Sequence, residues 1–308
     1  MRLRIGTRGS ALALAQSTDV AARLRALGHD PELVVISTVG DRVTDRAFTD
    51  VGSFGVFVRE LESALLEGAI DAAVHSYKDV PSRMPQGLVI AAVPERVDVA
   101  DVLLVRRDAV AAKRGGLPLA DGARVGTSAT RRRALLLDSR PDLVLGLLRG
   151  NVPTRVRSLS EGRFDAIVLA AAGLARLARA DGEHRLTLGD DITTVRLDPA
   201  VFVPAPSQGA IAVQVRESDV AVRAAIAPLD DQSCRRAIQA ERAALYLAEG
   251  GCTLPFGAWC SVASDGTLTL VAALGLEDGS VARSVAVGED PQAVASVAWD
   301  ELSRGVHA

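Results

Sequence analysis

The chain has 308 residues, of which 48% are hydrophobic, 24% charged and 3% aromatic, with a formal net charge of -3 at pH 7. This length predicts two or three domains of a globular protein, and the negative charge with so few aromatic rings argues against general nucleic-acid binding. No stretch approaches the ~18 uncharged apolar residues of a membrane helix, and three cysteines without a CxxC pair argue against a disulfide framework. Because charged and glycine residues interrupt the apolar run after Ile5, we expect no secretory signal but a cytoplasmic enzyme.

Strands and helices alternate through the first hundred residues, which predicts a mostly parallel sheet with helices on both faces. Ser10 is placed to cap the first helix, which ends before Gly28. The predicted strands are Leu3–Gly6, Leu33–Ser37, Asp71–Ser76 and Leu88–Val93, and the predicted helices are 11–27 and Val56–Leu66.

A second α/β unit begins near Asp101. Three prolines, at positions 199, 204 and 206, then mark an extended segment that crosses to one more strand, Ala210–Val215. The predicted strands of this unit are Val102–Val105, Arg124–Gly126, Leu143–Leu148 and Ala166–Leu169, and its helices are Ala129–Leu137, Val152–Leu159 and Ala171–Leu177.

The C-terminal part has a different pattern and predicts a small α+β region. A long helix over Ser233–Ala248 is followed by segments that alternate as antiparallel strands do, with turn signals at Asp265 and Asp278. The predicted strands are Ser261–Ala263, Leu268–Leu276 and Val281–Val287, and a helix over Pro291–Arg304 closes the chain.

Lys78 and Asp79 place a cation and a carboxylate side by side where an apolar strand ends. The chain has 35 basic residues, and Lys113 is its only other lysine. Strand ends are where α/β proteins bind ligands, so the pair is a candidate for chemistry, against the alternative of a structural cap. An enclosed Asp79 could act as a general acid or stabilise a cation on a substrate.

Hydroxyl and arginine side chains follow three predicted strands in equivalent loops. Hydroxyls, backbone N–H groups at helix starts and guanidinium groups all favour carboxylate or phosphate ligands. One such loop can be a solvated face, but three predict a polyanionic ligand held between the first two units. These residues are Arg8 and Ser10; Thr127, Ser128, Arg131 and Arg132; and Arg149 and Arg155.

Cys252 stands in a Gly-Gly-Cys sequence before Pro255, where the glycines allow close approach to the sulfur. This suits a covalent attachment site, and the alternative is a buried structural thiol. We interpret Cys234 and Cys260 as structural. His75 lies within an apolar strand and is interpreted as a packed histidine rather than a metal ligand, and no known metal-binding spacing is present.

Taken together, these motifs closely resemble those of the hydroxymethylbilane synthases, also called porphobilinogen deaminases, along nearly the whole chain. The resemblance implies two α/β domains like those of periplasmic binding proteins, over 1–97 with 207–227 and over 98–197, and a smaller α+β domain over 228–308. The matching segments are Gly6–Ser10, His75–Pro81, Val125–Ser128 with Arg131 and Arg132, Leu148–Val152, Gln208–Ala210 and Gly250–Cys252.

By this resemblance the protein is a transferase of tetrapyrrole (heme) biosynthesis. It would join four porphobilinogen molecules head to tail, with loss of ammonia, onto a dipyrromethane cofactor held by a thioether to Cys252, and release linear hydroxymethylbilane by hydrolysis. We expect a cytoplasmic monomer that binds porphobilinogen and its linear oligopyrrole intermediates, without nucleic acid, membrane or metal. The acetate and propionate groups of each pyrrole explain the arginine loops, and the cationic azafulvenium left by deamination explains Asp79.

The resemblance also assigns roles to individual residues. Asp79 would be catalytic, moving protons at the pyrrole nitrogen and the leaving amine and stabilising the cation. Residues implied in cofactor binding are Cys252, Lys78, Ser10, Ser76, Thr127, Ser128, Arg131, Arg132 and Arg149, and those implied in substrate binding are Arg8, Arg149, Arg155, Arg176 and Gln208.

The chain departs from the family pattern at a few positions. Phe54 stands where many members have a lysine, so one basic contact to the cofactor is missing, and Arg59 could compensate in part. Ala129 replaces a hydroxyl residue, Pro153 a glycine, and Ser207 the glycine before Gln208.

Two other functions compete with this interpretation. One is a non-catalytic binding protein of two α/β lobes, which would have no need of a cysteine in a glycine-rich loop. The other is a phosphate-handling transferase, but neither a GxxxxGK[ST] nor a GxGxxG after a strand is present.

Overall fold

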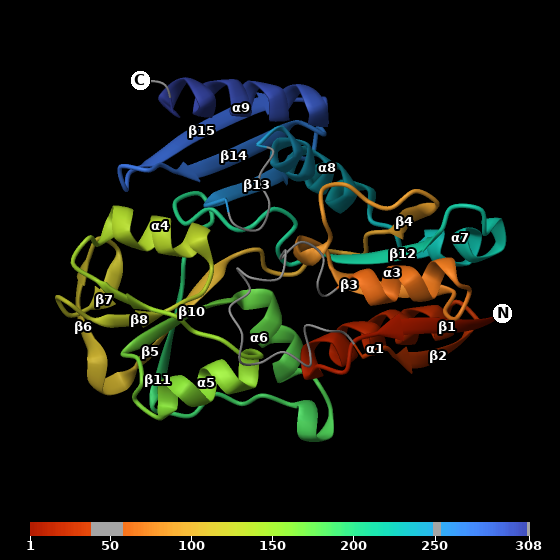
Figure 1. Ribbon diagram of the computed structural model, residues 1–308, viewed down its shortest axis with the longest axis horizontal. Helices are drawn as coiled ribbons and strands as arrows, with labels where there is room; N and C mark the ends of the chain where they lie inside the picture. The colour runs from red at the N-terminus through yellow and green to blue at the C-terminus, as the bar shows by residue number, and fades with distance from the viewer. Residues whose placement is uncertain (38–57, 249–253, 307–308) are drawn as a thin grey trace. The chain divides into compact units, whose positions relative to one another are not determined.

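The computed structural model of the chain describes residues 1–37, 58–248 and 254–306. These residues form two compact units (Figure 1). The first unit comprises Met1–Val97, Arg179–Arg185 and Gly209–Arg236, and the second comprises Asp98–Ala178, Leu186–Gln208 and Ala237–Ala308. A separate third domain over 228–308 stays a prediction.

The first unit is built on one five-stranded sheet in the order β2-β1-β3-β12-β4. Four strands run in one direction, and β12 is antiparallel to both of its neighbours, β3 and β4. The sheet is therefore mostly parallel, as expected, and β12 is its one reversed strand. The strands are β1 (Arg2–Thr7), β2 (Asp30–Val35), β3 (Ala72–Ser76), β4 (Leu88–Ala92) and β12 (Ile211–Arg216).

Helices cover both faces of this sheet, as predicted. Ala72 and Val74 of β3 pack in one core with α1 and α7, whereas Ala73 packs in a second core with α3. This alternation places His75 on the α3 face, because successive side chains of a strand point to opposite faces. The helices are α1 (Ala11–Ala26), α3 (Arg59–Leu66) and α7 (Val220–Ile226), with short 3-10 helices η1 (Tyr77–Asp79), η3 (Gly182–His184) and η4 (Ala227–Leu229).

The second unit contains a five-stranded sheet in the order β11-β5-β10-β8-β9. The strands β8, β9 and β10 are parallel, and β5 is antiparallel to both β10 and β11. The carboxyl ends of the three parallel strands therefore meet at one edge of the sheet, which is where the predicted arginine loops begin. The strands are β5 (Asp101–Arg106), β8 (Arg124–Gly126), β9 (Val144–Gly146), β10 (Ala166–Ala170) and β11 (Ile192–Arg196).

Helix α4 packs on one face of this sheet, and α5 and α6 pack on the other. On the second face Phe164 lies against two glycines at the ends of neighbouring strands. A Cβ atom at Gly126 would lie 3.0 Å from the ring, and one at Gly146 would lie 2.6 Å from it. The helices are α4 (Thr130–Ser139), α5 (Val152–Ser160) and α6 (Ala171–Ala178), with η2 (Arg107–Ala109) and the hairpin β6 (Val110–Arg114) and β7 (Leu117–Leu119).

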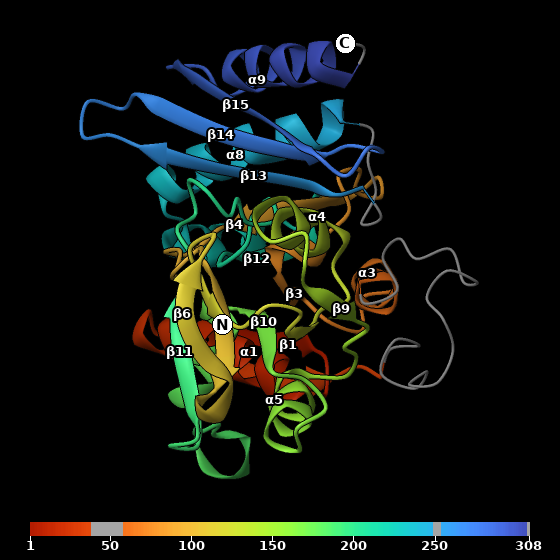
Figure 2. The same cartoon turned by 90° about the vertical axis from the view of Figure 1, so that its left-hand side faces the viewer.

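The C-terminal part of the second unit is an antiparallel sheet, β13-β14-β15, with α9 packed along β14 and β15 (Figure 2). Alanine, leucine and valine side chains form its core, which agrees with the predicted α+β character. The strand β13 starts earlier than expected and is longer. The elements are α8 (Gln232–Leu247), β13 (Phe256–Val262), β14 (Leu268–Gly275), β15 (Val281–Gly288) and α9 (Pro291–Val306).

The fold class is mixed α/β with a smaller C-terminal α+β part, as the strand and helix pattern predicted. The hairpin β6-β7, the strand β11 and the helix α7 were not expected, because they are short and lack a clear hydrophobic period. Within the described ranges, every helix is too short or too polar to cross a bilayer.

Candidate functional site

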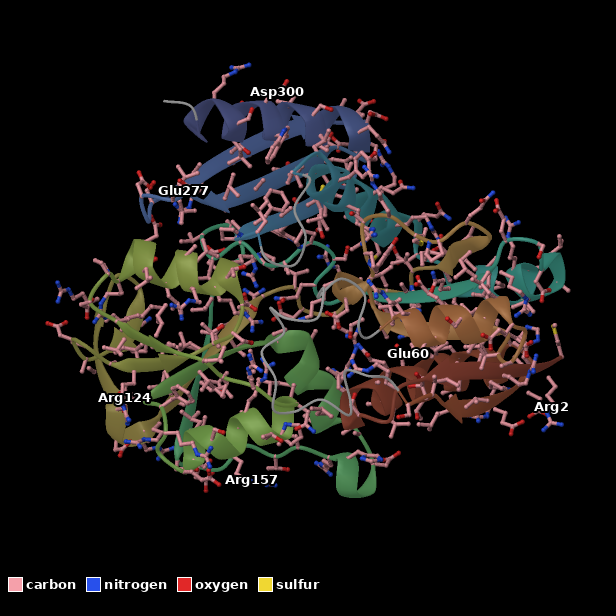
Figure 3. The ribbon with its side chains drawn as sticks, viewed as in Figure 1. Arg2, Glu60, Arg124, Arg157, Glu277 and Asp300 are labelled. Carbon is pink, nitrogen blue, oxygen red and sulfur yellow. The ribbon has the colours of Figure 1, made fainter. Side chains whose placement is uncertain are left out.

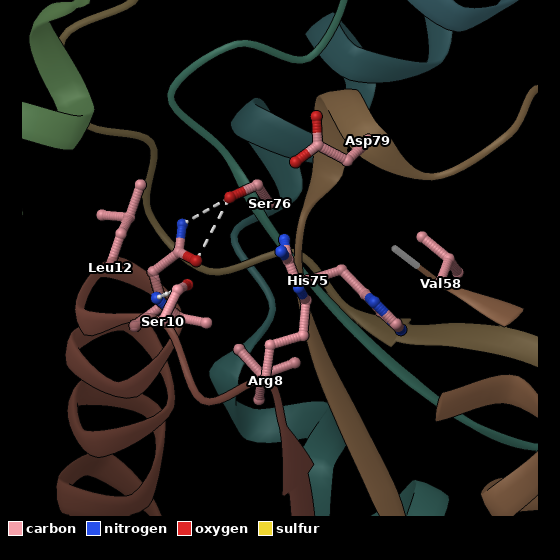
Figure 4. A pocket seen from close by; sticks show the side chains of 10 residues that line it. Arg8, Ser10, Leu12, Val58, His75, Ser76 and Asp79 are labelled. Carbon is pink, nitrogen blue, oxygen red and sulfur yellow. Dashed lines mark hydrogen bonds between the residues drawn. The ribbon is translucent and has the colours of Figure 1, made fainter. Parts of the chain in front are cut away.

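A pocket in the first unit lies where β1 and β3 end and α1 begins (Figure 4). Polar side chains from three elements share it with a few apolar ones. Arg8 and Ser10 come from the turn between β1 and α1, and Ser76 and Asp79 follow the end of β3. The pocket is lined by Arg8, Ser10, Leu12, Ala13, Gln16, Val58, Val74, His75, Ser76 and Asp79.

Ser10 is the N-cap of α1, as the sequence predicted. Its backbone is extended, and its hydroxyl accepts a hydrogen bond from the Ala13 N–H at 3.4 Å. Capping satisfies one of the free N–H groups at the helix start and fixes the angle at which the chain enters α1. The cap therefore holds a hydroxyl and, two residues earlier, the Arg8 side chain at the same pocket.

Gln16 is a pocket residue that sequence reasoning missed. Its side chain is buried on α1, and its Nε2 donates to the Ser76 hydroxyl at 2.8 Å while that hydroxyl donates to Gln16 Oε1 at 3.1 Å. The pair joins α1 to the end of β3 across a sequence separation of 60 residues. A polar residue on the buried face of a predicted helix is the signal that could have identified it.

Lys78 and Asp79 lie in η1, directly after β3, and they differ in how far their side chains are exposed. Lys78 is half-buried, whereas Asp79 is exposed and lines the pocket. Within the described ranges, no residue donates a hydrogen bond to the carboxylate of Asp79, so its oxygens can accept hydrogen bonds from a ligand. A structural cap, the alternative weighed for Asp79, requires such a bond.

His75 is a packed histidine, as interpreted from the sequence, and it ends a buried chain of polar groups. Its Nε2 lies 2.9 Å from Gln214 Oε1, and Gln214 Nε2 donates to Glu62 Oε1 at 3.1 Å. Burial is the main cause that lowers the pKa of His75 to about 4, and burial raises the pKa of Glu62. A neutral imidazole therefore lines the pocket beside Arg8.

The predicted anion loops of the second unit follow β8, β9 and β10. Thr127 is buried and its hydroxyl accepts from the Ala129 N–H, whereas Ser128 is exposed. Asn151 caps α5 through Thr154, and the guanidinium of Arg155 donates to the Gly150 carbonyl at 2.7 Å. The half-buried arginines of these loops and of α6 are Arg149, Arg155 and Arg176.

Arg131 and Arg132 differ from these arginines because both are buried on α4. Arg131 donates to Asp101 Oδ2 at 2.8 Å and to the Val203 carbonyl, and Arg132 donates to Asp101 Oδ1 through Nη2 at 2.7 Å. Arginines such as Arg124 and Arg157, by contrast, project outward from the second unit (Figure 3).

Asp101 is completely buried at the start of β5 and was not identified from the sequence. Burial alone would raise its pKa, but the charges of Arg131 and Arg132 outweigh burial and hold the pKa well below its ordinary value. Gln208, also buried, donates from Nε2 to Asp101 Oδ1 at 3.0 Å and to the Val99 carbonyl at 2.8 Å. Two guanidinium groups therefore share one carboxylate, which leaves one net positive charge in this cluster.

Cys252, the predicted attachment residue, lies outside the described residues, as does Phe54. The other two cysteines, Cys234 and Cys260, are buried, which agrees with their interpretation as structural.

The chain is similar to known proteins over nearly its whole length. Residues 3–224 match the family model "Porphobilinogen deaminase, dipyromethane cofactor binding domain", and residues 235–297 match that of the C-terminal domain. The porphobilinogen deaminase of Syntrophobacter fumaroxidans is 45% identical over 294 residues, covering 94% of this chain and 90% of that protein. The one of Geobacillus kaustophilus is 43% identical over 305 residues, covering 97% and 93%. A periplasmic substrate-binding protein of Coxiella burnetii is 16% identical with a TM-score of 0.44, covering 77% and 96%.

Proposed function

The chain belongs to the porphobilinogen deaminase family, and on this premise we propose which of its residues carry out the reaction. It is a hydroxymethylbilane synthase, a transferase of tetrapyrrole (heme) biosynthesis. The enzyme condenses four porphobilinogen molecules head to tail, with loss of ammonia, onto a covalently bound dipyrromethane. Hydrolysis then releases linear hydroxymethylbilane.

The described residues fit a cofactor that carries acetate and propionate groups. The pocket of the first unit presents Arg8 with the hydroxyls of Ser10 and Ser76, and the Asp101 cluster of the second unit has one positive charge in excess. When bound, dipyrromethane supplies the terminal pyrrole carbon to which a substrate is joined. We propose that it is attached to Cys252 and held by Lys78, Ser10, Ser76, Thr127, Ser128, Arg131, Arg132 and Arg149.

The observation that carries the assignment of Asp79 is its exposed carboxylate at a pocket that also holds Arg8. Because no described residue donates to this carboxylate, it can accept a pyrrole N–H, take up its proton and pass a proton to the leaving amine. The same negative charge stabilises a cation that develops on the substrate. His75, which lines the same pocket, is neutral and therefore adds no positive charge that would oppose this stabilisation.

We assign Arg8, Arg149, Arg155 and Arg176 to the carboxylates of the substrate. Arg155 supports this role, because its Nε donates to the Gly150 carbonyl and so fixes a planar guanidinium group, the fork that suits a carboxylate, at the loop after β9. Gln208 was expected among the substrate contacts as well. Its amide donates to Val99 and Asp101, and we therefore propose that it acts through Asp101.

The proposal includes a cytoplasmic monomer of three domains. The sparse cysteines, three in 308 residues without a CxxC pair, support a reducing compartment. Light scattering of the purified chain tests the monomer, because a dimer would double the measured mass.

Intact mass under denaturing conditions tests the attachment site. Cells supplied with porphobilinogen should yield a chain heavier by the mass of one dipyrromethane, and Cys252→Ser should abolish the added mass. Cys260→Ser is the matched control and should keep it. A wild-type chain without added mass even after incubation with porphobilinogen would contradict the proposed attachment and favour the binding-protein alternative.

A further inference from the structure

The chain turns sharply at residues 205–208, where the second unit's middle segment ends. The N–H of Gln208 donates to the Ala205 carbonyl at 2.9 Å, which closes a four-residue turn with Pro206 in second position. Ser207, in third position, has φ 65° and is the only non-glycine residue with positive φ in the described ranges. Proline followed by positive φ is the pattern of a type II turn, which favours glycine in third position.

The Ser207 side chain does not explain this conformation. Ser207 is completely buried, and its hydroxyl has no hydrogen-bond partner among the residues that the structure describes. A left-handed backbone costs free energy at any residue with a Cβ atom. Another group must therefore hold the turn.

Glu241 of α8 provides that group. Its Oε2 accepts the Ser207 N–H at 2.6 Å and its Oε1 accepts the Cys260 N–H at 2.9 Å, and the whole residue is buried. Each carboxyl oxygen thus accepts one backbone N–H that would otherwise be buried without a partner. The carboxylate therefore ties the turn to β13 within the second unit.

The contact with Glu241 also selects the type of turn. Type I and type II turns differ by a flip of the central peptide, here the one between Pro206 and Ser207. The N–H of this peptide is the one that Glu241 accepts. After a flip to type I the Pro206 carbonyl oxygen would face Glu241 Oε2 instead, so that two hydrogen-bond acceptors would lie against each other without a donor between them.

The turn also sets the direction of the side chain of Gln208, its last residue. Its side chain reaches the Val99 carbonyl and Asp101, and Asp101 holds Arg131 and Arg132. We propose that Glu241 is a positioning residue for this arginine cluster. It holds Ser207 in the left-handed conformation, and this conformation directs the Gln208 side chain toward Asp101. The inference rests on the proposed role of the cluster in holding the cofactor and substrate.

The experiment compares three holoenzyme variants, Glu241→Gln, Ser207→Gly and the double variant, with the wild type. A neutral glutamine can accept one of the two N–H groups but repels the other with its own N–H groups. We expect Glu241→Gln to raise the KM for porphobilinogen about tenfold, the cost of one unsupported left-handed residue, and to lower the fraction of chains with the covalent cofactor. The kcat should stay within about twofold, because Asp79 is in the other unit.

Ser207→Gly is the decisive variant, since glycine needs no carboxylate to keep a positive φ. The double variant should regain a KM within about twofold of the wild type and its cofactor content. If the double variant keeps the defect of Glu241→Gln, or if Glu241→Gln unfolds and the double variant unfolds too, Glu241 acts through Cys260 and the inference is wrong.

Gln208→Leu separates this inference from the proposed function. A wild-type KM and cofactor content in Gln208→Leu would overturn the inference, because Glu241 could then not act through Gln208, while the proposed function of the cluster is tested separately by Arg131→Leu. A defect in Gln208→Leu together with a normal Glu241→Gln would overturn only the role of Glu241.

Discussion

Arg132 donates two hydrogen bonds to the same carboxylate oxygen of the buried Asp101, from Nε at 3.2 Å and from Nη2 at 2.7 Å. Arg131 donates to the other oxygen, so that one carboxylate neutralises half of the charge of two buried cations. A buried ion pair contributes little net stability over apolar packing, but the loss of one partner leaves a charge that nothing compensates. We therefore expect the main role of Asp101 to be that of counter-ion to the two buried arginines.

Asp101→Asn should destabilise the protein by about 3–5 kcal/mol, because two guanidinium groups would stay buried without a counter-ion. Urea unfolding followed by circular dichroism measures this loss. Asp108→Asn is the matched control: Asp108 also binds an arginine through two oxygens but is 71% exposed, and its loss should cost less than about 1 kcal/mol. Equal effects of the two substitutions would contradict the importance of the buried charge.

Asp79→Asn should lower turnover of porphobilinogen by at least about 100-fold, since an amide can neither take up a proton nor stabilise a cation. The melting temperature should be unchanged, because no described residue donates to the Asp79 carboxylate. Single-turnover assays of the purified variant, with ammonia release as the signal, measure the rate. Asp300→Asn, at an exposed position of α9, should keep wild-type turnover. Wild-type rates in Asp79→Asn would refute its catalytic role.

Arg149→Leu and Arg131→Leu should differ, although the sequence assigns both arginines to anions. Arg149 is half-buried, so its loss should impair cofactor assembly or chain extension while the free energy of unfolding stays within about 1 kcal/mol of the wild type. Arg131 is buried against Asp101 and Val203, and its loss should also destabilise the protein by about 3 kcal/mol. Unfolding curves and intact masses of both variants test this, and normal product formation by both would contradict the role of the arginines in anion binding.

His75 should remain neutral down to about pH 4 in the folded protein, whereas it takes up a proton below about pH 6.5 when unfolded. Protons then favour the unfolded state, so stability is complete above pH 6.5 and falls as the pH drops toward 4. Between pH 7 and pH 5 the wild type should lose about 2 kcal/mol more than His75→Gln. Urea unfolding at the two pH values measures the difference, and equal losses would show that His75 is not held neutral.

Local sequence patterns predicted much of the fold and the first half of the pocket. Ser10 was identified as an N-cap because capping depends only on the residues next to it, and the strand before Lys78 was recognised by its apolar run. The loops that contain Thr127 and Arg149 were predicted to lie at one edge of the sheet, because parallel strands end at the same edge. Each of these features is encoded within about ten residues.

The partners of buried polar groups could not be predicted in this way. Arg131 and Arg132 were placed correctly at a helix start, but their counter-ion Asp101 is 30 residues earlier and on another element. Gln214, which holds His75, is 139 residues further along the chain. Pairing at such distances is decided by the register of neighbouring strands, which hydrophobic patterns do not specify.

The residues tolerated at Gly126 and Gly146 depend on the residue at position 164, and the reverse is also true. Since the ring occupies the space of both missing Cβ atoms, an alanine at either glycine collides with it, while a smaller residue at 164 alone leaves a void over two strands. The three positions can therefore drift only together, and the order of the steps matters. A library randomised at Gly146 alone should return glycine, whereas one randomised at Gly146 and Phe164 jointly should recover larger residues at the first position paired with smaller ones at the second.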